Sequence, residues 1–328
     1  MHDFFLSCDW GGSAFRLRLV DIRTRSILEE IISGEGMTST FNRWKIRFEQ
    51  GPVSREDYGL MVLHNQVQAL GKKTTTPLSS IPVLISGMAS SSIGIRELPY
   101  AGLPFSLDGR DTQIEIIAPG AHFMHEVMLI SGIRTKDDVI RGEETQMIGL
   151  AANAGTDFNG ELVCLFPGTH SKHIKVKKTR LVDFKTYITG ELFDLLTRNS
   201  ILKESVSADV PPLDNAGRDA FKSGIIESGK SNLLNSLFSV RVSHLFKART
   251  KEENYFFLSG LLIGTELKAL RRHDPGHIQL CSGTNLFSLY KLALEHLDLS
   301  SKTSFVEPEI VDKSAVEGQL KIFHHHYD

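Results

Sequence analysis

The chain has 328 residues, of which 41% are hydrophobic and 23% are charged, and its formal net charge at pH 7 is -2. This composition is typical of a folded protein, and the length suits two domains of average size. A protein that binds mainly nucleic acid is excluded, because contacts with a phosphate backbone need a clustered basic surface and no stripe of Lys and Arg stands out.

Cysteine content and apolar runs indicate the compartment of the protein. Cys8, Cys164 and Cys281 lie far apart in apolar segments, so we expect three buried, free thiols and a reducing compartment. The N-terminus has no signal-peptide pattern, and no apolar run approaches the ~20 residues that span a bilayer. We therefore expect a cytoplasmic protein that does not act at a membrane.

The first part of the chain predicts an α/β unit. Residues 4–8 are apolar, and residues 15–19 alternate between apolar side chains and arginines, which is the period of a half-buried strand. Residues 58–70 have the spacing of an amphipathic helix, and residues 81–85 return as a buried strand that ends at Gly87. Two or three antiparallel strands are thus followed by a helix and a further strand.

The second part of the chain repeats this order. Strands are predicted at residues 162–167, 174–176, 181–184, 278–281 and 304–306. Helices are predicted at residues 190–198, 216–226, 233–245, 252–272 and 285–297, and an amphipathic segment at residues 313–323 ends the chain. The repeated order predicts a duplicated α/β fold with a cleft between its lobes. We place the domains at residues 1–142 and 143–328, with the last helix packing back on the N-terminal domain.

The segment from Asp9 to Ser13, with the sequence Asp-Trp-Gly-Gly-Ser, forms a turn after the first strand. Gly11 and Gly12 allow backbone amides to approach a phosphate closely, and the Ser13 hydroxyl adds a donor. Asp9, at the strand end, could hold hydrated magnesium. A plain hairpin is the alternative, because Gly-Gly is a common hairpin connector.

A second turn, Gly168, Thr169, His170, Ser171 and Lys172, again lies between two predicted strands. Its amides and hydroxyls could donate to a polyphosphate, and the ammonium group would neutralise charge. The segment is not the GxxxxGK[ST] loop, because no helix follows it. Because the two turns lie at the same place in two similar units, together they indicate a phosphate-binding site more strongly than either turn does alone.

Two further segments could complete a nucleotide-dependent site. Phosphoryl transfer to a hydroxyl needs a carboxylate, which Glu143 or Glu144 could supply, although acidic residues also favour a helix start through its dipole. Ser282, Gly283 and Thr284 join a strand to a helix, where they could support an adenosine or simply cap the helix.

The chain resembles the 2-dehydro-3-deoxygalactonokinase (2-keto-3-deoxygalactonate kinase) family of the actin/hexokinase-like superfamily. The likeness spans the chain and rests on the blocks DWGGSAFRLRLVD, GMASSSIGIRELPY, RGEETQMIGL, LFPGTHSKHIKV, FLSGLLIGTEL and SGTNLFSLYKLAL. It implies an α/β fold of two ribonuclease-H-like domains with a nucleotide cleft between them, and ATP and Mg²⁺ as cofactors.

The resemblance also implies roles for individual residues. It assigns Asp9, Gly11 and Gly12 to the first phosphate motif, residues 168–172 to the second and Ser282, Gly283 and Thr284 to the adenosine turn. In the related glycerol and xylulose kinases a catalytic acid begins a helix shortly before the second phosphate loop, and Glu143 or Glu144 occupies that place here. Candidate contacts with the sugar acid are Arg16, Gly87, Met88, Tyr100 and Arg141.

Two positions depart from the family pattern. Gly12 stands where the family usually has Thr, and residues 89–95 replace a Gly-Ser, polar pair and Gly-Trp pattern. If the second segment contacts the sugar acid, the substrate differs from that of the family.

We expect a kinase that phosphorylates the 6-hydroxyl of 2-dehydro-3-deoxy-D-galactonate in carbohydrate acid catabolism. The alternatives are a sugar kinase with a different or neutral substrate, and a catalytically degenerate sensor that binds a sugar acid or nucleotide. A homodimer is compatible with the sequence, although no particular residue indicates one.

Overall fold

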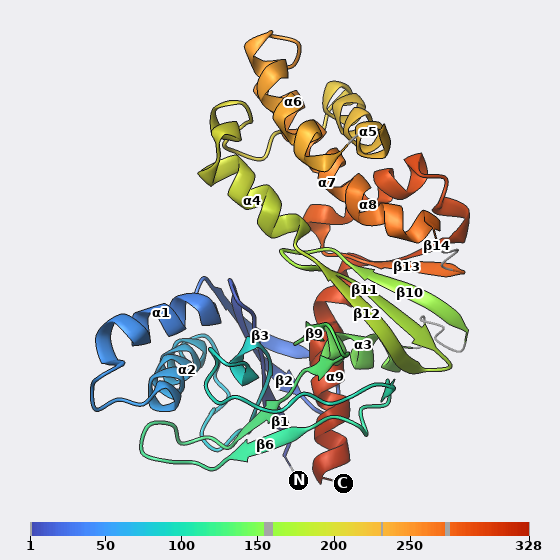
Figure 1. The fold of residues 1–328 in the computed structure, drawn as a ribbon. Helices are drawn as coiled ribbons and strands as arrows, with labels where there is room; N and C mark the ends of the chain where they lie inside the picture. Colours follow the sequence, from blue (N-terminus) through green and yellow to red (C-terminus); the bar gives the residue numbers. More distant parts are fainter. Residues whose placement is uncertain (1, 154–159, 231, 273–275, 328) are drawn as a thin grey trace. The chain divides into compact units, whose positions relative to one another are not determined.

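The structure is a computed structural model that describes residues 2–153, 160–230, 232–272 and 276–327. The chain divides into two compact units, which can be followed by colour in Figure 1. Unit 1 consists of Met1–Gly160, Lys177–Asp183 and Ile310–Asp328, and unit 2 consists of Glu161–Val176 and Phe184–Glu309.

A six-stranded sheet forms the centre of unit 1. Its order is β3-β2-β1-β4-β7-β6, and β1, β4 and β7 are parallel to one another, whereas β2, β3 and β6 pair antiparallel with their neighbours. The bounds are β1 Phe4–Trp10, β2 Phe15–Asp21, β3 Ile27–Ser33, β4 Val83–Gly87, β6 Ile114–Ile117 and β7 Val127–Ile130.

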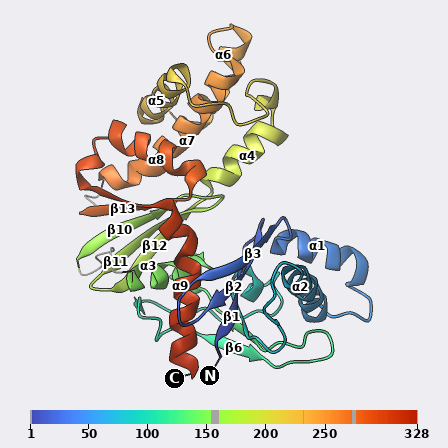
Figure 2. The ribbon, with the colours of Figure 1, turned by 180° about the vertical axis from the view of Figure 1, so that it is seen from behind.

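Helices cover both faces of this sheet. Side chains of β1 alternate between the faces, so Leu6 and Cys8 pack with α2 (Arg55–Gly71), while Phe5 stacks on Phe323 of α9 with 6.0 Å between ring centroids. Helix α9 therefore lies on the face opposite α2 (Figure 2). The remaining elements of unit 1 are α1 Met37–Phe48, a 3₁₀ turn Met88–Ser90, β5 Phe105–Ser106, β8 Ile133–Arg134, β9 Val139–Ile140, α3 Glu143–Ala152 and, from Ile310 onward, α9 Pro308–Tyr327.

Polar and close-packed contacts fix α9 on unit 1. Arg18 of β2 is buried and donates to Glu30 at 2.5 Å and to the Asp312 carbonyl oxygen at 2.7 Å. Gln319 donates to the Cys8 carbonyl oxygen at 2.9 Å. Where α9 crosses α3, a Cβ atom added to Gly318 would lie 1.9 Å from the Thr145 carbonyl oxygen, so only glycine fits there.

The sheet of unit 2 has the same strand order as the sheet of unit 1. Its strands run β14-β13-β10-β11-β12, and those of unit 1 run β3-β2-β1-β4-β7. Counted along the chain within each unit, the first strand lies between the second and the fourth: β10 between β11 and β13, and β1 between β2 and β4. The tip of the β11–β12 hairpin belongs to unit 1, where Arg180 and Leu181 pair with β5. The bounds are β10 Glu161–Phe166, β11 Ser171–Lys177, β12 Arg180–Tyr187, β13 His277–Cys281 and β14 Thr303–Val306.

Most of the core of unit 2 is helical. The helices are α4 Thr189–Asn199, α5 Asn215–Lys230, α6 Leu233–Leu245, α7 Lys251–Arg272 and α8 Thr284–His296, with 3₁₀ turns at Ile201–Glu204 and Ser300–Lys302. Helices α5 and α7 pack closely, because a Cβ atom on Gly260 would lie 2.0 Å from the Phe221 carbonyl oxygen. Phe221, Phe257 and Leu261 are buried at this crossing.

The structure confirms the predicted α/β fold class, the strands and helices predicted above and the three buried, free cysteines. Helix α1 and the strands between Phe105 and Ile140 were not predicted. The units divide after Gly160 rather than after residue 142, so α3 belongs to unit 1. Within the described stretches, no helix is both long and apolar enough to cross a membrane.

Candidate active site

The start of α1 holds the first glycine turn in place. Backbone N–H groups of Met37 and Thr38 donate to the carbonyl oxygens of Gly11 and Gly12 at 2.9 and 3.1 Å. A Cβ atom on Gly36 would lie 2.3 Å from the Gly12 carbonyl oxygen, so the helix reaches the turn only because residue 36 is glycine. The turn is therefore packed directly against the start of α1.

Asp9 lies at the end of β1 beside this turn. Burial raises the pKa of its carboxyl group, Arg16 lowers it from a distance of 3.4 Å, and the nearby Glu143 raises it again. Gly87, at the end of the neighbouring strand β4, has φ +93°, and a Cβ atom there would lie 2.7 Å from the Trp10 carbonyl oxygen. Strand β4 can thus approach Asp9 only with glycine at this position.

Helix α3 brings its first acidic residues to the same place. Gly142 has φ +105°, and a Cβ atom on it would touch Gly87 at 3.4 Å. Glu144 is buried, and it accepts hydrogen bonds from the Gly142 N–H at 2.7 Å and from the Thr145 hydroxyl at 3.0 Å. Burial and the adjacent Glu143 raise the pKa of Glu144 to about 8. Glu143, which is half-buried, is therefore the member of the pair that faces Asp9.

The other candidate substrate residues form a packed cluster in unit 1. Arg141 donates to the Ser90 hydroxyl at 2.7 Å and to the Leu98 carbonyl oxygen at 3.0 Å, and its guanidinium group lies 3.9 Å from the centre of the Tyr100 ring. Met88 is half-buried beside Ser90. The segment that departs from the family pattern is thus anchored by Arg141, and a Cβ atom on Gly94 would lie 2.1 Å from the Ala89 carbonyl oxygen.

The second glycine turn is held by α4 in the way that α1 holds the first. A Cβ atom on Gly190 would lie 2.5 Å from the Gly168 carbonyl oxygen, and the Glu191 N–H donates to the Thr169 carbonyl oxygen at 2.9 Å. Glu191 also contacts His170, whose Nε2 lies 2.5 Å from its carboxylate. Both units therefore use a glycine at a helix start to fix their turn.

The residues of the second turn differ in exposure. Thr169 and His170 are exposed and Lys172 is half-buried, whereas Ser171 is buried and its hydroxyl lies 3.0 Å from that of Tyr290. The open side of the turn is therefore formed by Gly168, Thr169 and His170.

A cavity of about 600 Å³ in unit 2 begins at this turn. The rings of Phe193 and Tyr255 pack edge to face in its wall, with 4.9 Å between their centroids. Its lining is mostly apolar and consists of Gly168, Thr189, Gly190, Phe193, Val210, Pro211, Leu213, Arg218, Tyr255, Phe256, Ser259, Leu262, Ile263, Asn285, Leu286, Ser288, Leu289 and Tyr290. A pocket of this size and character suits a nucleoside.

The predicted adenosine turn lies next to this cavity rather than in its wall. Ser282 is buried and donates to the Gly283 carbonyl oxygen at 3.0 Å, and Gly283 precedes α8, which begins at Thr284. The lining begins at the next residue, Asn285. The strand-to-helix turn could be recognised in the sequence, but the aromatic residues of α4 and α7 could not, because helix spacing alone does not show that their side chains line a cavity.

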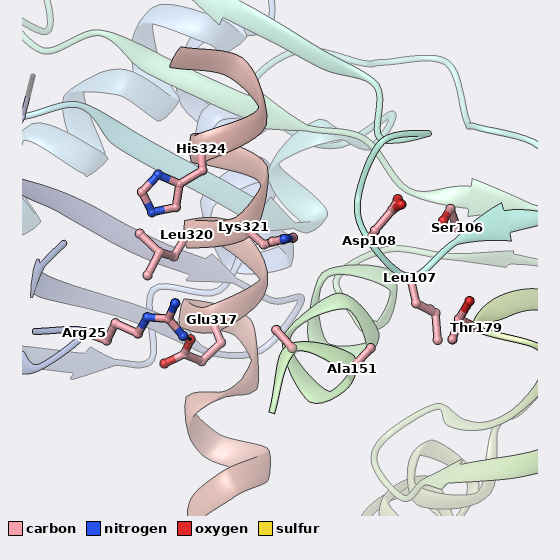
Figure 3. Close-up of a pocket in the computed structure, with 11 residues that line it drawn as sticks. Arg25, Ser106, Leu107, Asp108, Ala151, Thr179, Glu317, Leu320, Lys321 and His324 are labelled. Atoms are coloured by element: carbon pink, nitrogen blue, oxygen red, sulfur yellow. Dashed lines mark ion pairs between the residues drawn. The ribbon is translucent and has the colours of Figure 1, made fainter. Parts of the chain in front are cut away.

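A second cavity, of about 370 Å³, lies in unit 1 beside α9 (Figure 3). Arg25 and Glu317 form an ion pair at 3.6 Å on one side of it, and Figure 3 shows Lys321 pointing toward the segment that carries Asp108. The predicted site residues are not part of its lining.

The acidic residues of unit 1 suit a magnesium ion that is held jointly with phosphate. Asp9 and Glu143 are carboxylates close enough for one to raise the pKa of the other, and a cation would relieve that repulsion. Among the described residues, no group of three or more His, Cys, Asp or Glu side chains could hold a metal by itself. The donors therefore fit Mg²⁺, which needs only one or two carboxylates beside phosphate oxygens and water.

Two units of matching strand order, each with a glycine turn after its first strand, define an α/β fold of the actin/hexokinase-like class. A solved structure of the activator of 2-hydroxyisocaproyl-CoA dehydratase from Clostridium difficile, with bound ADPNP, shares this fold at 13% identity and a TM-score of 0.51, and the match covers 98% of this chain and 95% of that chain. Residues 9–312 match the sequence model of the family described as 2-keto-3-deoxy-galactonokinase. The chain belongs to this family.

Individual relatives agree with this assignment. The "probable 2-dehydro-3-deoxygalactonokinase DgoK1" of Rhizobium meliloti (strain 1021) is 31% identical over 90% of each chain. The 2-dehydro-3-deoxygalactonokinase of Escherichia coli (strain K12) is 33% identical over 65% of this chain and 70% of its own length. The crystal structure of a candidate 2-dehydro-3-deoxygalactonokinase from Sinorhizobium meliloti matches 96% of this chain and 95% of its own at 29% identity, with a TM-score of 0.77. The predicted family and phosphotransferase class are confirmed.

Proposed function

We propose that the protein transfers the γ-phosphoryl group of ATP to the 6-hydroxyl of 2-dehydro-3-deoxy-D-galactonate. The observation that carries this proposal is the meeting of Asp9 and Glu143 at two positive-φ glycines, Gly87 and Gly142, in a chain of the galactonokinase family. The named relatives act on this sugar acid by their descriptions.

Glu143 is the proposed base. Its carboxylate accepts the proton of the 6-hydroxyl while the hydroxyl oxygen bonds to the γ-phosphorus and the bond between that phosphorus and the leaving oxygen of ADP breaks. Glu144 is buried, with a pKa of about 8, and bonds to its own helix start, so it positions α3 instead. Asp9 is the proposed magnesium ligand, and the ion would neutralise phosphate charge during transfer.

Unit 2 is the proposed nucleotide-binding part. The backbone N–H groups of Thr169 and His170, on the open side of the second turn, would donate to phosphate oxygens, and Lys172 would add positive charge. The apolar cavity that begins at Gly168 would hold the adenosine.

Arg16 is the proposed partner of the substrate carboxylate, because it is about two-fifths exposed. The guanidinium group of Arg141 already holds Ser90, Leu98 and the Tyr100 ring, so its proposed role is to shape the substrate loop. Residues 89–95, which depart from the family pattern, are bound through Ser90 to Arg141, among the candidate substrate residues. A different acceptor of the phosphoryl group is therefore the main alternative. The cytoplasmic location and the homodimer stay predictions from the sequence.

The test is coupled release of ADP from MgATP across a panel of 2-keto-3-deoxy sugar acids and neutral sugars. Turnover on 2-dehydro-3-deoxy-D-galactonate supports the proposal. Turnover on another acid or a neutral sugar retains the kinase mechanism and replaces the substrate. Nucleotide binding without turnover on any member would favour the sensor and overturn the proposal.

Exchange of Glu143 for Gln tests the proposed base. We expect Glu143→Gln to lower kcat by roughly 10²- to 10⁴-fold with little change in the Kd of MgATP, since a general base acts on the chemical step. Steady-state kinetics and calorimetric MgATP binding measure the two effects. Near-normal turnover in this variant would exclude Glu143 as the base.

A further inference from the structure

A buried carboxylate in unit 2 has no role in the site described above. Glu266 of α7 is 3% exposed, and burial of a carboxylate is unfavourable unless its oxygens accept hydrogen bonds. Three side chains meet this need: His173 Nε2 lies 3.0 Å from Oε1, the Tyr290 hydroxyl donates to Oε2 at 2.8 Å, and the Thr189 hydroxyl donates to the same oxygen. These partners come from β11, α8 and the first residue of α4.

The same hydrogen bonds continue to the second glycine turn. The Tyr290 hydroxyl lies 3.0 Å from the Ser171 hydroxyl, and the Ser171 oxygen accepts a hydrogen bond from the Gly168 N–H at 3.4 Å. Glu266, Tyr290, Ser171 and Gly168 therefore form one continuous chain of hydrogen bonds, which we call the Glu266 relay.

The carboxylate decides the direction of every bond in the relay. An ionised carboxylate only accepts, so Tyr290 must give its single hydroxyl hydrogen to Glu266. Burial and the nearby Glu266 raise the pKa of Tyr290, which keeps that hydrogen in place. The Tyr290 oxygen then accepts from Ser171, and Ser171, with its only hydrogen used, can only accept from the Gly168 N–H.

We propose that Glu266 is a positioning residue that holds the Gly168 backbone through Tyr290 and Ser171, and that Ser171 supports the turn instead of donating to phosphate. This inference rests on the proposed role of residues 168–172 in nucleotide binding and narrows it. The phosphate donors of the turn are then its exposed backbone, Thr169 and Lys172, while Ser171, which is 1% exposed, lies behind them.

A double-mutant cycle on Ser171→Ala and Tyr290→Phe tests the relay. Each single variant should weaken MgATP binding about tenfold, because one buried hydrogen bond is lost and the turn is released. The double variant should be no weaker than either single variant, because both changes break the same chain of bonds. Additive losses would show that Ser171 contacts phosphate independently and would overturn the proposal.

Glu266→Gln keeps the shape of the side chain but places an amide donor against groups that already donate. It should weaken MgATP binding by a similar factor. Ser228→Ala is the matched control, because Ser228 is also a buried serine of unit 2 and its hydroxyl donates within α5, to the Ile225 carbonyl oxygen. Its MgATP affinity should equal that of the unchanged protein.

Hydrogen exchange of the Gly168 amide, followed by NMR without nucleotide, separates the relay from the proposed function. The relay predicts the same acceleration of exchange in Ser171→Ala, Tyr290→Phe and Glu266→Gln, and none in Ser228→Ala. Unchanged exchange in the three variants would overturn the relay even if MgATP binds. Failure of the unchanged protein to bind MgATP would instead overturn the proposed function, and the exchange result would still decide the relay.

Discussion

The second turn can pack against the start of α4 because residue 190 is glycine and has no Cβ atom. The Gly168 carbonyl oxygen would lie 2.5 Å from a Cβ atom at this position, which is closer than such atoms approach, so a side chain must displace the turn. The neighbouring Glu191 N–H donates to the Thr169 carbonyl oxygen at 2.9 Å, so the start of α4 and the turn are in direct contact.

We therefore expect Gly190→Ala to weaken MgATP binding by at least about tenfold and to lower kcat as well, because displacement of a positioning loop by ~1 Å can cost 10²-fold. The measurement is the Kd of MgATP by calorimetry together with steady-state kinetics. Gly229→Ala is the control, since among the described residues no atom outside its own stretch of α5 lies within 4 Å of an added Cβ atom, and it should bind normally. Equal affinities for both variants would contradict the account of the turn.

Glu144 makes stability depend on pH. Its pKa is about 8 in the folded protein and near 4.5 in the unfolded chain, because burial and Glu143 disfavour the charged form. The folded protein thus binds the proton more tightly, and the stability contributed by this group is fully present below about pH 4.5 and is lost as pH rises toward 8.

Glu144→Gln should remove that decline, since the amide stays neutral. We expect the free energy of unfolding of the unchanged protein to fall between pH 5 and pH 8 relative to that of Glu144→Gln, as measured by urea unfolding at each pH. Parallel curves for the two proteins would show that Glu144 titrates normally.

At the scale of elements, the crossing of α3 and α9 depends on two glycines. Gly149 of α3 lies against the backbone of α9, and Gly318 of α9 lies against the backbone of α3, so neither position has space for a methyl group. Since α3 begins with Glu143, this crossing also determines where the proposed base lies.

Gly318→Ala should lower the free energy of unfolding by roughly 1–3 kcal/mol, because overpacking against backbone outweighs the gain in helix propensity. Gly229→Ala, in the open part of α5, should be as stable as the unchanged protein or slightly more stable. Urea unfolding of both variants provides the comparison, and a stable Gly318→Ala protein would mean that the helices separate without loss.

The sequence predicted the elements whose apolar residues repeat strongly and missed those whose residues do not. Helix α1 buries only Met37 and Thr40 and leaves Ile46 85% exposed, so few of its residues mark it as part of the core. Strand β7 is buried between β4 and β6 but has only four residues, too few to show a period.

The site was predicted in part for a similar reason. The glycine turns are local in sequence and could be recognised. The roles of Gly36 and Gly190 depend on contacts with those turns, and the difference between Glu143 and Glu144 depends on burial in the folded protein. Spacing along the chain does not contain that information.

At the scale of the whole molecule, unit 1 is assembled from distant parts of the chain. Arg18, Phe5 and the Cys8 carbonyl oxygen all find partners in α9, at Asp312, Phe323 and Gln319. Removal of α9 would leave the Arg18 guanidinium half-paired and expose the apolar face around Phe5.

A variant that ends at Glu309 should therefore lose protection in unit 1 and retain it in unit 2. Amide hydrogen exchange should accelerate in β1 and β4, while amides of α7 and β13 stay protected. Simultaneous loss of protection in both units would indicate that they unfold as one cooperative body.

The return of α9 to the N-terminal strands also has a consequence during synthesis. A ribosome makes β1, β2 and β4 first and α9 only after all of unit 2, so the sheet of unit 1 emerges with one apolar face uncovered and waits for residues 310–327. Unit 2 can complete its core in the meantime, because Glu161–Val176 and Phe184–Glu309 precede the part of α9 that belongs to unit 1. The strands of unit 1 are thus translated before unit 2 but covered after it, and these nascent strands are the segment most in need of a chaperone.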